Sequence, residues 1–353
     1  MEGTSKNHLK SIITLVVSLA FAGFFLWIAL RGFDFSIVKK SLAKANYLWV
    51  AFAGVFGLLA YWLRAVRWNL LLEPMGHKIS DANAFWTISF GYLMNLTIPR
   101  SGEVARATAL YGVEKVPVDK SFGTIILERV VDLICMMGFL LLTLIFKYEA
   151  ILAFYHFVTE TKKTAHVSKP NSFEKFILQT GISDLNAFYF YLKIFIFVLI
   201  IAGLVALYRL KKEKFISFAR GIFQGLTSIF KLKQKVRFIL YTLGIWISYF
   251  FAAYLVCFAL PETSDFTFAD GFFIITVGTL AMIVPASGGL GAFNLAMKYG
   301  FMALFIGAGK SAEFGAEMGL TYSFISLPLQ FFLTLVTGLI SIPVLAKAKS
   351  KMV

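Results

Sequence analysis

The sequence predicts an all-α protein that crosses the membrane several times, and three observations support this. Hydrophobic residues make up 59% of the chain and charged residues 15%, whereas soluble domains carry about 25% charged residues. The mean hydropathy is +0.77, and several apolar runs reach the roughly 20 residues that a spanning helix needs. Two further apolar runs are interrupted by the same short motif. We therefore expect a polytopic fold of about six full spans plus two re-entrant hairpins, arranged as an inverted repeat.

The repeated motif lies at residues 98–106 and again at residues 284–292. Both copies read Pro-x-Ser-Gly-x, followed by an apolar residue and a small residue. Proline and glycine break a helix and free backbone N–H and C=O groups, which a bilayer tolerates only where protein or a watery cavity receives them. Broken segments at corresponding places in two halves are typical of a transport site near the membrane midplane. Two ordinary surface loops are the alternative, and the repetition argues against it.

Residues 1–147 are predicted to form the first membrane repeat. Its parts are spans at residues 12–30, 47–72 and 121–146 and a hairpin at residues 82–110. The first run is too long for a signal peptide and lacks a small-residue cleavage site, so we expect it to remain as a span. In the connector at residues 31–46, lysines lie beside regularly spaced apolar residues, which is typical of a helix lying in the membrane interface.

A polar stretch at residues 148–185 separates the halves and is predicted to be an extracytoplasmic loop. Residues 186–353 then repeat the plan of the first half. The parts of this second membrane repeat are spans at residues 186–208, 238–260 and 319–346 and a hairpin at residues 271–306. The basic segment at residues 209–237 has large apolar residues at three- and four-residue steps, which indicates a second interfacial helix with a cationic face.

Charged segments set the predicted topology. The basic segment at residues 209–237 and the basic tail belong in the cytoplasm, and the acidic residues 262–270 belong outside, so we expect both termini in the cytoplasm. Three spans in each half turn the second half upside down, and the two hairpins then enter from opposite sides. The lysines of residues 31–46 would lie outside in this arrangement. Counting one hairpin as fully spanning would move them inside but would break the match between the halves.

Ionisable residues inside the apolar segments form the predicted functional cluster. Arg64 and Arg67 lie three apart, and Glu128 and Asp132 lie four apart, so each pair shares a helix face. The arginines could instead reach the headgroups, and Arg129 could take part in an internal ion pair that only fixes helix packing. Charge at membrane depth is costly and usually functional, so we favour an acidic face lining a cavity. The arginines expected opposite this face are Arg64, Arg67, Arg100 and Arg106.

The sequence does not support a metal site, a disulfide framework or catalysis. Cys135 and Cys257 lie inside apolar runs, and the four histidines are scattered singly. No nucleophile–base pair or nucleotide-binding loop is recognisable, so we expect no cofactor and no enzymatic activity. The net charge of +15 lies in loops. On a membrane protein this indicates anionic lipid at the basic interfacial helices and no nucleic acid as a partner.

Four motifs occur in a fixed order along the chain. They are Arg64-x-x-Arg67-Trp68, Pro99-x-x-Gly102-Glu103-x-x-Arg106, Glu128-Arg129-x-x-Asp132 and Pro285-x-x-Gly288-Gly289-Leu290-Gly291. Over nearly the whole chain this set resembles the lysylphosphatidylglycerol synthase transmembrane (flippase-like) family. The resemblance implies an integral protein of a bacterial or archaeal cell (inner) membrane that moves a lipid between leaflets. Two-domain members carry an aminoacyl transferase domain after the membrane domain, and here we expect a stand-alone member without it.

The predicted substrate carries a phosphate, because arginine forks and the free N–H groups at the starts of the hairpin helices suit phosphate oxygens. We expect a membrane phospholipid or a polyprenyl-phosphate lipid as partner, and a homo-oligomer is compatible with the sequence. The carboxylates would balance the arginines in the empty site or carry protons. The predicted substrate-binding residues are Arg64, Arg67, Pro99, Arg100, Ser101, Gly102, Glu103, Arg106, Glu128, Arg129, Asp132, Pro285, Ser287, Gly288, Gly289, Gly291 and Asn294.

Asn294 is a departure from the family pattern, which often has an acidic residue at this position. A neutral side chain offers no negative charge to a cationic headgroup, so we expect an anionic lipid to be preferred over lysylphosphatidylglycerol. Two other functions are compatible with the sequence. An ion-coupled carrier for a small solute would use the same broken helices, but it would not need basic interfacial helices. A membrane enzyme acting on a lipid phosphate is the weaker alternative, because no catalytic constellation supports it.

Overall fold

The computed structural model describes residues 35–98, 100–164, 220, 222–224, 227–283 and 289–350. Every regular element within these ranges is a helix, which confirms the predicted all-α fold. The chain divides into two compact units, one made of Met1–Phe154 with Ile222–Val353 and the other of Tyr155–Gly221. The helices that build the site all belong to the first unit.

Four helices within the described residues are long and apolar enough to cross a membrane. They are α3 (Tyr47–Leu72), α6 (Val118–Phe146), α11 (Lys235–Tyr254) with its 3-10 continuation η3 (Leu255–Ala259), and α14 (Ala312–Ser350). They overlap the four spans predicted for the described part of the chain, and their number and apolar character are those of a multi-pass membrane protein. The predicted spans at residues 12–30 and 186–208 lie outside the described residues.

The helix α14 begins earlier than the predicted span because its first turns are built into the protein core. A Cβ atom on Gly315 would press against the Phe305 side chain, and one on Gly319 would collide with the backbone of Met297. Both contacts lie on α13 (Ala292–Gly307). The first turns of α14 therefore pack at close range against α13.

The first broken segment folds into a helical hairpin made of α4 (Asp81–Thr97) and α5 (Gly102–Glu114). At its base the Glu114 carboxylate accepts hydrogen bonds from the backbone N–H of Ser80, at 3.1 Å, and from the side-chain amide of Asn83, at 2.7 Å. These bonds join the start of α4 to the end of α5. The predicted hairpin is thus present as two antiparallel helices, and it extends to the end of α5.

The tip of this hairpin is a tight turn with close backbone packing. Arg100 has a φ of 61°, in the left-handed region that non-glycine residues seldom adopt. The side-chain oxygen of Asn95 accepts a hydrogen bond from the Gly102 N–H at 2.7 Å, which satisfies one of the free donors at the start of α5. Gly102 lies directly against the Gly91 carbonyl, where a side chain would not fit.

The second broken segment forms a matching hairpin of α12 (Phe268–Ala281) and α13 (Ala292–Gly307). Its base is closed by an ion pair between Asp265 and Lys310 at 3.3 Å. The Phe266 ring also packs on rings of α13. This hairpin, like the first, therefore has both ends together and its break at the far end.

The second tip leads into α13 through glycines. Gly289 and Gly291 have φ values of 76° and 77°, which favour glycine. The Asn294 side-chain oxygen accepts a hydrogen bond from the Gly291 N–H at 3.1 Å, and its amide donates to Ser323 Oγ of α14 at 2.8 Å. Asn294 thus holds the start of α13 in place.

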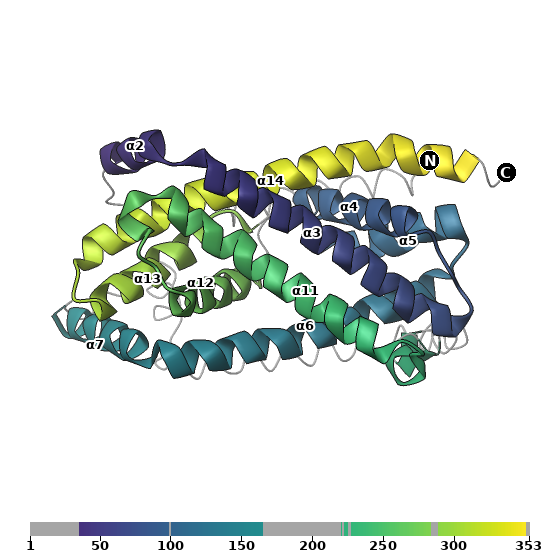
Figure 1. Ribbon diagram of the computed structural model, residues 1–353, viewed down its shortest axis with the longest axis horizontal. Coiled ribbons are helices and arrows are strands. Elements are labelled where there is room, and N and C mark those ends of the chain that lie inside the picture. Colours follow the sequence, from purple (N-terminus) through teal and green to yellow (C-terminus); the bar gives the residue numbers. More distant parts are fainter. Residues whose placement is uncertain are drawn as a thin grey trace, which may run out of the picture. The chain divides into compact units, whose positions relative to one another are not determined.

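The two hairpin tips contact each other. The Arg100 guanidinium donates from Nη2 to the carbonyl oxygen of Ile283 at 2.9 Å. In Figure 1 the pair α4 and α5 lies toward one end of the long helices and the pair α12 and α13 toward the other. The breaks in the two halves therefore meet between the two hairpins.

Each hairpin also packs against the other half of the chain. The first helix of one hairpin, α4, lies on α14, where a Cβ atom on Gly338 would meet Leu93. The first helix of the other, α12, lies on α6, where the Thr143 hydroxyl is hydrogen-bonded at 3.0 Å to both the Phe272 carbonyl and the Thr276 hydroxyl. In each half, therefore, the first hairpin helix packs on the long helix that follows the hairpin of the other half.

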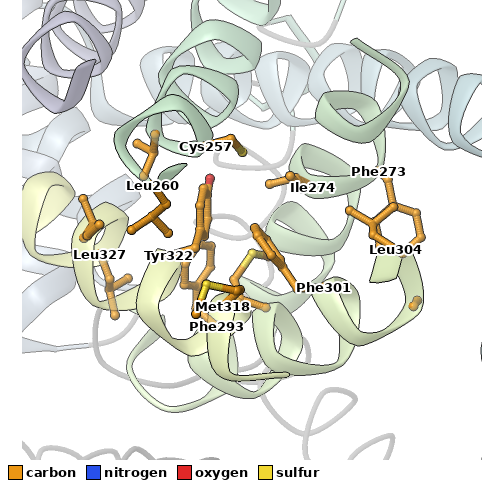
Figure 2. Packing of buried hydrophobic residues seen from close by; sticks show 14 of the residues in the cluster. Cys257, Leu260, Phe273, Ile274, Phe293, Phe301, Leu304, Met318, Tyr322 and Leu327 are labelled. Carbon is orange, nitrogen blue, oxygen red and sulfur yellow. The ribbon is translucent and has the colours of Figure 1, made fainter. Parts of the chain in front are cut away.

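A large apolar core surrounds the second hairpin (Figure 2). Its side chains come from η3, α12, α13 and α14 and include Cys257, Leu260, Phe273, Ile274, Phe293, Phe301, Leu304, Met318, Tyr322 and Leu327. The Tyr322 hydroxyl satisfies its hydrogen-bonding capacity by donating to the Ala253 carbonyl at 2.9 Å. The core therefore fixes the second hairpin between α14 and the end of α11.

The predicted loop at residues 148–185 is wrong in its first part, because the helix α7 (Tyr148–Thr164) begins there. Ala150 is buried, and Ile151 and Phe154 pack against the core described above. These apolar residues lie on one face of an otherwise polar stretch. Overall composition hides such a face, whereas helical spacing reveals it.

The predicted helix in the connector after the first span is confirmed as α2 (Phe35–Lys44). Lys39 and Lys40 are exposed, while Leu42 packs against the core. About half of the predicted basic helix at residues 209–237 lies outside the described residues. The described part includes the short 3-10 turn η2 (Thr227–Lys231) and the start of α11.

Gly102→Ala is expected to destabilise the first hairpin. The added Cβ would collide with the Gly91 carbonyl oxygen and the Asn95 amide, and overpacking typically costs about 1–3 kcal/mol. Gly112→Ala in the same helix is the matched control, because no atom outside that helix lies within 4 Å of the added Cβ. The control should be neutral or stabilise the protein by up to about 1 kcal/mol. Thermal unfolding in detergent measures both variants, and equal melting temperatures would contradict the close packing.

Candidate functional site

A cavity of about 650 Å³ lies between the two hairpins. Residues of α3, α4, α6, α11, α12 and α14 contribute to its wall, so both halves of the chain build it. Leu96 near the first hairpin tip and Met282 near the second both belong to this wall. Most of the wall is apolar, and the charged side chains include Arg64. The cavity therefore combines an apolar surface with a polar region at membrane depth.

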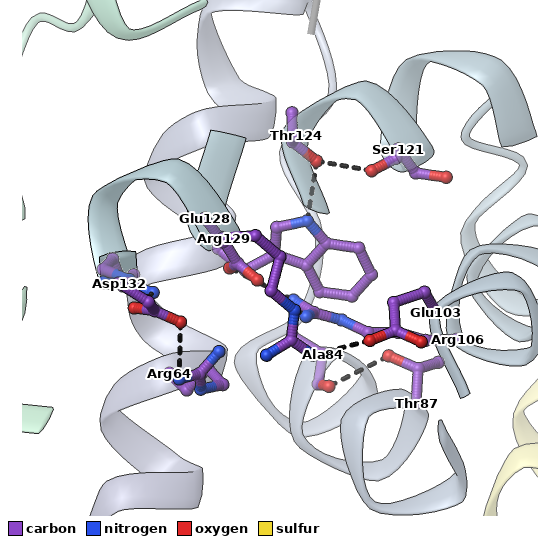
Figure 3. Close-up of polar contacts among 12 residues, drawn as sticks. Arg64, Ala84, Thr87, Glu103, Arg106, Ser121, Thr124, Glu128, Arg129 and Asp132 are labelled. Atoms are coloured by element: carbon purple, nitrogen blue, oxygen red, sulfur yellow. Dashed lines mark hydrogen bonds and ion pairs between the residues drawn. The ribbon is translucent and has the colours of Figure 1, made fainter. Parts of the chain in front are cut away.

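Asp132 of α6 binds two arginines of α3 at once. Its Oδ2 accepts a hydrogen bond from Arg64 Nη2 at 2.9 Å (Figure 3), and its Oδ1 accepts one from Arg67 Nη2 at 3.1 Å. Arg67 is fully buried and also donates from Nη1 to Thr242 Oγ1 of α11 at 3.2 Å. Removing one partner of such a group would leave a buried charge unpaired, which is strongly destabilising. The three side chains are therefore fixed with respect to one another.

Arg106 of α5 and Glu128 of α6 form a second buried ion pair. Both guanidinium ends donate to the carboxylate, from Nη1 at 2.7 Å and from Nη2 at 3.2 Å. The guanidinium carbon lies 3.5 Å from the centre of the Trp68 ring, a cation–π contact. The Trp68 indole in turn donates to Thr124 Oγ1 at 2.8 Å. This arrangement confirms that Arg106 and Glu128 share one polar cluster, and it joins α5 to α6 and α3.

Arg129 forms a third ion pair, with Glu103 of α5, at 2.8 Å. The side chains are 50% and 27% exposed, and pairs of this kind contribute only about 0.2–1 kcal/mol. Arg129 also belongs to the cavity wall. The ion pairs of Glu128, Arg129 and Asp132 thus join α6 to neighbouring helices, and these three residues do not pair with one another.

The cluster carries more positive than negative charge. Four arginines face three carboxylates across these pairs, an excess of one positive charge. Within the described residues the charged side chains of the cavity wall are Arg64, Arg129 and Asp132, which leaves the same excess. The described ranges contain no group of potential ligands that could hold a metal ion. The wall is therefore suited to an anion.

The predicted site residues fall into three groups by position. Those in the cavity wall are Arg64, Arg129 and Asp132. Those that support the wall through ion pairs are Arg67, Glu103, Arg106 and Glu128. Those that build the hairpin tips are Arg100, Ser101, Gly102, Gly289, Gly291 and Asn294. Pro99, Pro285, Ser287 and Gly288 lie outside the described residues.

Sequence reasoning missed the neutral polar side chains of the cavity wall. They include Tyr61, Tyr92, Asn95, Tyr249 and Gln330. Asn95 and Gln330 lie within apolar runs, and an amide at that depth is a signal that could have identified them. The tyrosines gave no comparable signal, because tyrosine is common wherever a helix meets the membrane interface.

Comparison with known proteins connects the chain to membrane proteins. Residues 15–336 match the family described as lysylphosphatidylglycerol synthase TM region. A UPF0104 membrane protein from Methanocaldococcus jannaschii is 29% identical over 126 residues, which cover 35% of this chain and 36% of the relative. Glycosyltransferase AglD from Haloferax volcanii is 26% identical over 136 residues, which cover 38% of this chain and 22% of the relative. These matches thus span well under half of either relative. No solved structure matches the chain.

Arg106→Met and Glu128→Leu, alone and combined, test the buried ion pair. Each single change leaves one charge buried without its partner, so each is expected to lower the unfolding free energy by about 3–5 kcal/mol, and the double change should cost clearly less than the sum. Arg129→Met and Glu103→Leu form the control cycle, where the coupling should not exceed about 1 kcal/mol. Denaturant unfolding in detergent gives both coupling energies. Additive effects at Arg106 and Glu128 would refute the pairing.

Proposed function

The chain belongs to the lysylphosphatidylglycerol synthase TM region family, and on this premise we propose that it moves a phosphate-bearing lipid between the two leaflets of the membrane. The candidate substrates are a phospholipid and a polyprenyl-phosphate-linked lipid of a bacterial or archaeal cell membrane. The observation that carries the proposal is the cavity between the hairpins, whose wall combines an excess positive charge with a mainly apolar surface.

A phosphate headgroup must cross a hydrocarbon layer about 30 Å thick, and it loses its water there unless other donors replace it. Arg64 and Arg129 bring such donors to the cavity wall. A guanidinium carries five N–H donors, and Arg64 donates to Asp132 through Nη2. Its Nε has no hydrogen-bond partner among the described residues. Donors therefore remain for an anionic oxygen, while the tails of the lipid stay beside the apolar wall.

The ion pairs behind the cavity position the arginines of the wall. Asp132 orients Arg64, and the second bond from Arg67 keeps the carboxylate in place while Arg64 offers its remaining donors to a ligand. Arginine stays protonated and acts only as a donor. The proposal is therefore a translocation by binding and release, without covalent chemistry and without a cofactor.

We further propose that both hairpins are re-entrant and form an inverted repeat. Three features support this: the closed hairpin bases, the contact of the tips between Arg100 and Ile283, and the exchanged packing of α4 on α14 and of α12 on α6. With both termini in the cytoplasm, the first hairpin enters from the cytoplasm and the second from outside. Anionic lipids would gather at the basic interfacial segments.

Purified protein in vesicles is expected to accelerate the movement of fluorescent phosphatidylglycerol between leaflets. Arg64→Gln removes the excess positive charge of the cavity wall while Asp132 keeps its bond to Arg67. The rate should fall about tenfold or more, because hydrogen bonds to charged groups contribute about 1.5–3 kcal/mol. Lys310→Gln at the base of the second hairpin is the control and should keep the rate.

Dithionite quenching of the outer leaflet over time measures these rates. The proposal fails if the unchanged protein moves neither phosphatidylglycerol nor a labelled polyprenyl-phosphate lipid faster than protein-free vesicles do. If Lys310→Gln lost as much activity as Arg64→Gln, the loss could not be attributed to the charge of the cavity wall.

Single cysteines test the inverted repeat. Ser101→Cys and Ser287→Cys are made in a chain whose Cys135 and Cys257 are replaced by alanine, and Lys349→Cys marks the side of the C-terminal tail. A thiol reagent that cannot cross the membrane should reach the two hairpin tips from opposite sides. Labelling of both tips from the same side, as for two surface loops, would refute the arrangement.

A further inference from the structure

The cavity wall carries neutral hydroxyl and amide groups that the proposed phosphate contacts do not use. Tyr92 and Asn95 of α4, Tyr249 of α11 and Gln330 of α14 all belong to this wall. Arg64 and Arg129, the proposed phosphate contacts, belong to the same wall. The neutral groups therefore lie beside the proposed phosphate contacts, and they come from both halves of the chain.

Several of these groups have hydrogen-bonding capacity to spare. The Tyr92 ring lies tilted against the Tyr61 ring with 4.6 Å between their centres, and the Arg64 guanidinium carbon lies 5.7 Å from the centre of the Tyr249 ring. Neither the Tyr92 nor the Tyr249 hydroxyl is hydrogen-bonded to another described residue, whereas the Tyr61 hydroxyl is bonded to Thr334 Oγ1 at 3.1 Å. Both free hydroxyls can therefore donate to, and accept from, a ligand.

A buried donor in the same wall indicates the same kind of ligand. Trp246 lies three residues before Tyr249 on α11, is 6% exposed and belongs to the cavity wall. Its indole N–H has no hydrogen-bond partner in the described part of the chain. A buried donor without a partner is costly and calls for an explanation. An oxygen-rich ligand in the cavity would supply the missing acceptor.

We propose that the phosphate of the substrate carries a polyhydroxylated group, a glycerol or a sugar, and that Tyr92, Asn95, Tyr249 and Gln330 bind its hydroxyls. This inference rests on the proposed translocation and adds the class of headgroup. Polyol hydroxyls donate and accept hydrogen bonds, as do phenol hydroxyls and side-chain amides. The tyrosine rings also offer apolar faces to the C–H groups of the polyol.

The size of the cavity agrees with a headgroup larger than phosphate. Its volume of about 650 Å³ lies within the range of about 300–1,000 Å³ in which proteins bind drug-sized ligands. A phosphate alone would leave most of this space unfilled and the Tyr92, Tyr249 and Gln330 side chains without a ligand.

The charges of the wall disfavour an ammonium-bearing headgroup. Asp132 is the carboxylate among the described wall residues, and both of its oxygens are bound by Arg64 and Arg67. An ammonium would meet Arg64 and Arg129 without a free anion to balance it. Unfavourable like charges of this kind give selectivity against the wrong ligand.

Pairs of lipids that differ only in their headgroup hydroxyls test whether the protein recognises these hydroxyls in addition to the phosphate. Phosphatidylglycerol and phosphatidylmethanol carry the same phosphodiester charge, but only phosphatidylglycerol has free hydroxyls. A polyprenyl hexosyl phosphate and a polyprenyl methyl phosphate form the same comparison with prenyl tails. In at least one pair the hydroxylated lipid should move about threefold to tenfold faster or more, and the pair that shows the difference identifies the source of the headgroup.

Tyr92→Phe and Tyr249→Phe test the wall itself, because each removes only a hydroxyl. Each is expected to slow the hydroxylated lipid about threefold to tenfold and to leave the methyl ester and the melting temperature unchanged. Tyr241→Phe, on α11 but outside the cavity wall, is the matched control and should change neither rate. A merely structural role would lower the melting temperature or slow both lipids alike.

The outcomes distinguish the two levels of the proposal. Equal rates within both lipid pairs, with movement intact, would overturn the polyol assignment and leave translocation standing. Unchanged selectivity in both phenylalanine variants would likewise overturn the role of this wall. Failure of all four lipids to move would overturn the proposed translocation itself.

Discussion

The buried charges of the described helices are held in ion pairs, and the arrangement of the first half depends on this constraint. An isolated guanidinium or carboxylate away from water is too costly to keep, so Asp132 fixes α3 on α6 and Glu128 fixes α5 on α6. Apolar packing alone would specify these positions weakly, because lipid tails are as apolar as the helix surfaces that they cover. The pairs therefore set which residues of neighbouring helices lie side by side.

The same constraint connects the fold to its function. The ion pairs leave one positive charge in excess around the cavity. An anionic ligand would neutralise this charge. Arg67 binds Asp132, and Trp68 packs against Arg106. Because these contacts do not involve a ligand, the wall can keep its shape whether or not a ligand is present. A preformed site of this kind loses little ordering entropy when it binds.

The spans and hairpins could be predicted because hydropathy changes sharply at their ends and because Pro99 and Pro285 break apolar runs. The helix α7 was not predicted, since its apolar face is short and surrounded by polar residues. Partners could not be predicted at all. Arg106 and Glu128 lie on different helices, and helical periodicity shows which face a residue occupies but not which helix it meets. Tyr92 and Tyr249 were missed for the same reason, since only the folded chain brings them to one wall.

The contact between the hairpin tips constrains the two halves unequally. Arg100 contributes a side chain, whereas Ile283 contributes only its backbone carbonyl. Any amino acid at position 283 would preserve the acceptor, but few at position 100 could reach across as a donor and also adopt the left-handed turn. The two copies of the motif are therefore constrained differently at this contact. The first copy is restricted in amino-acid identity, and the second only in backbone path.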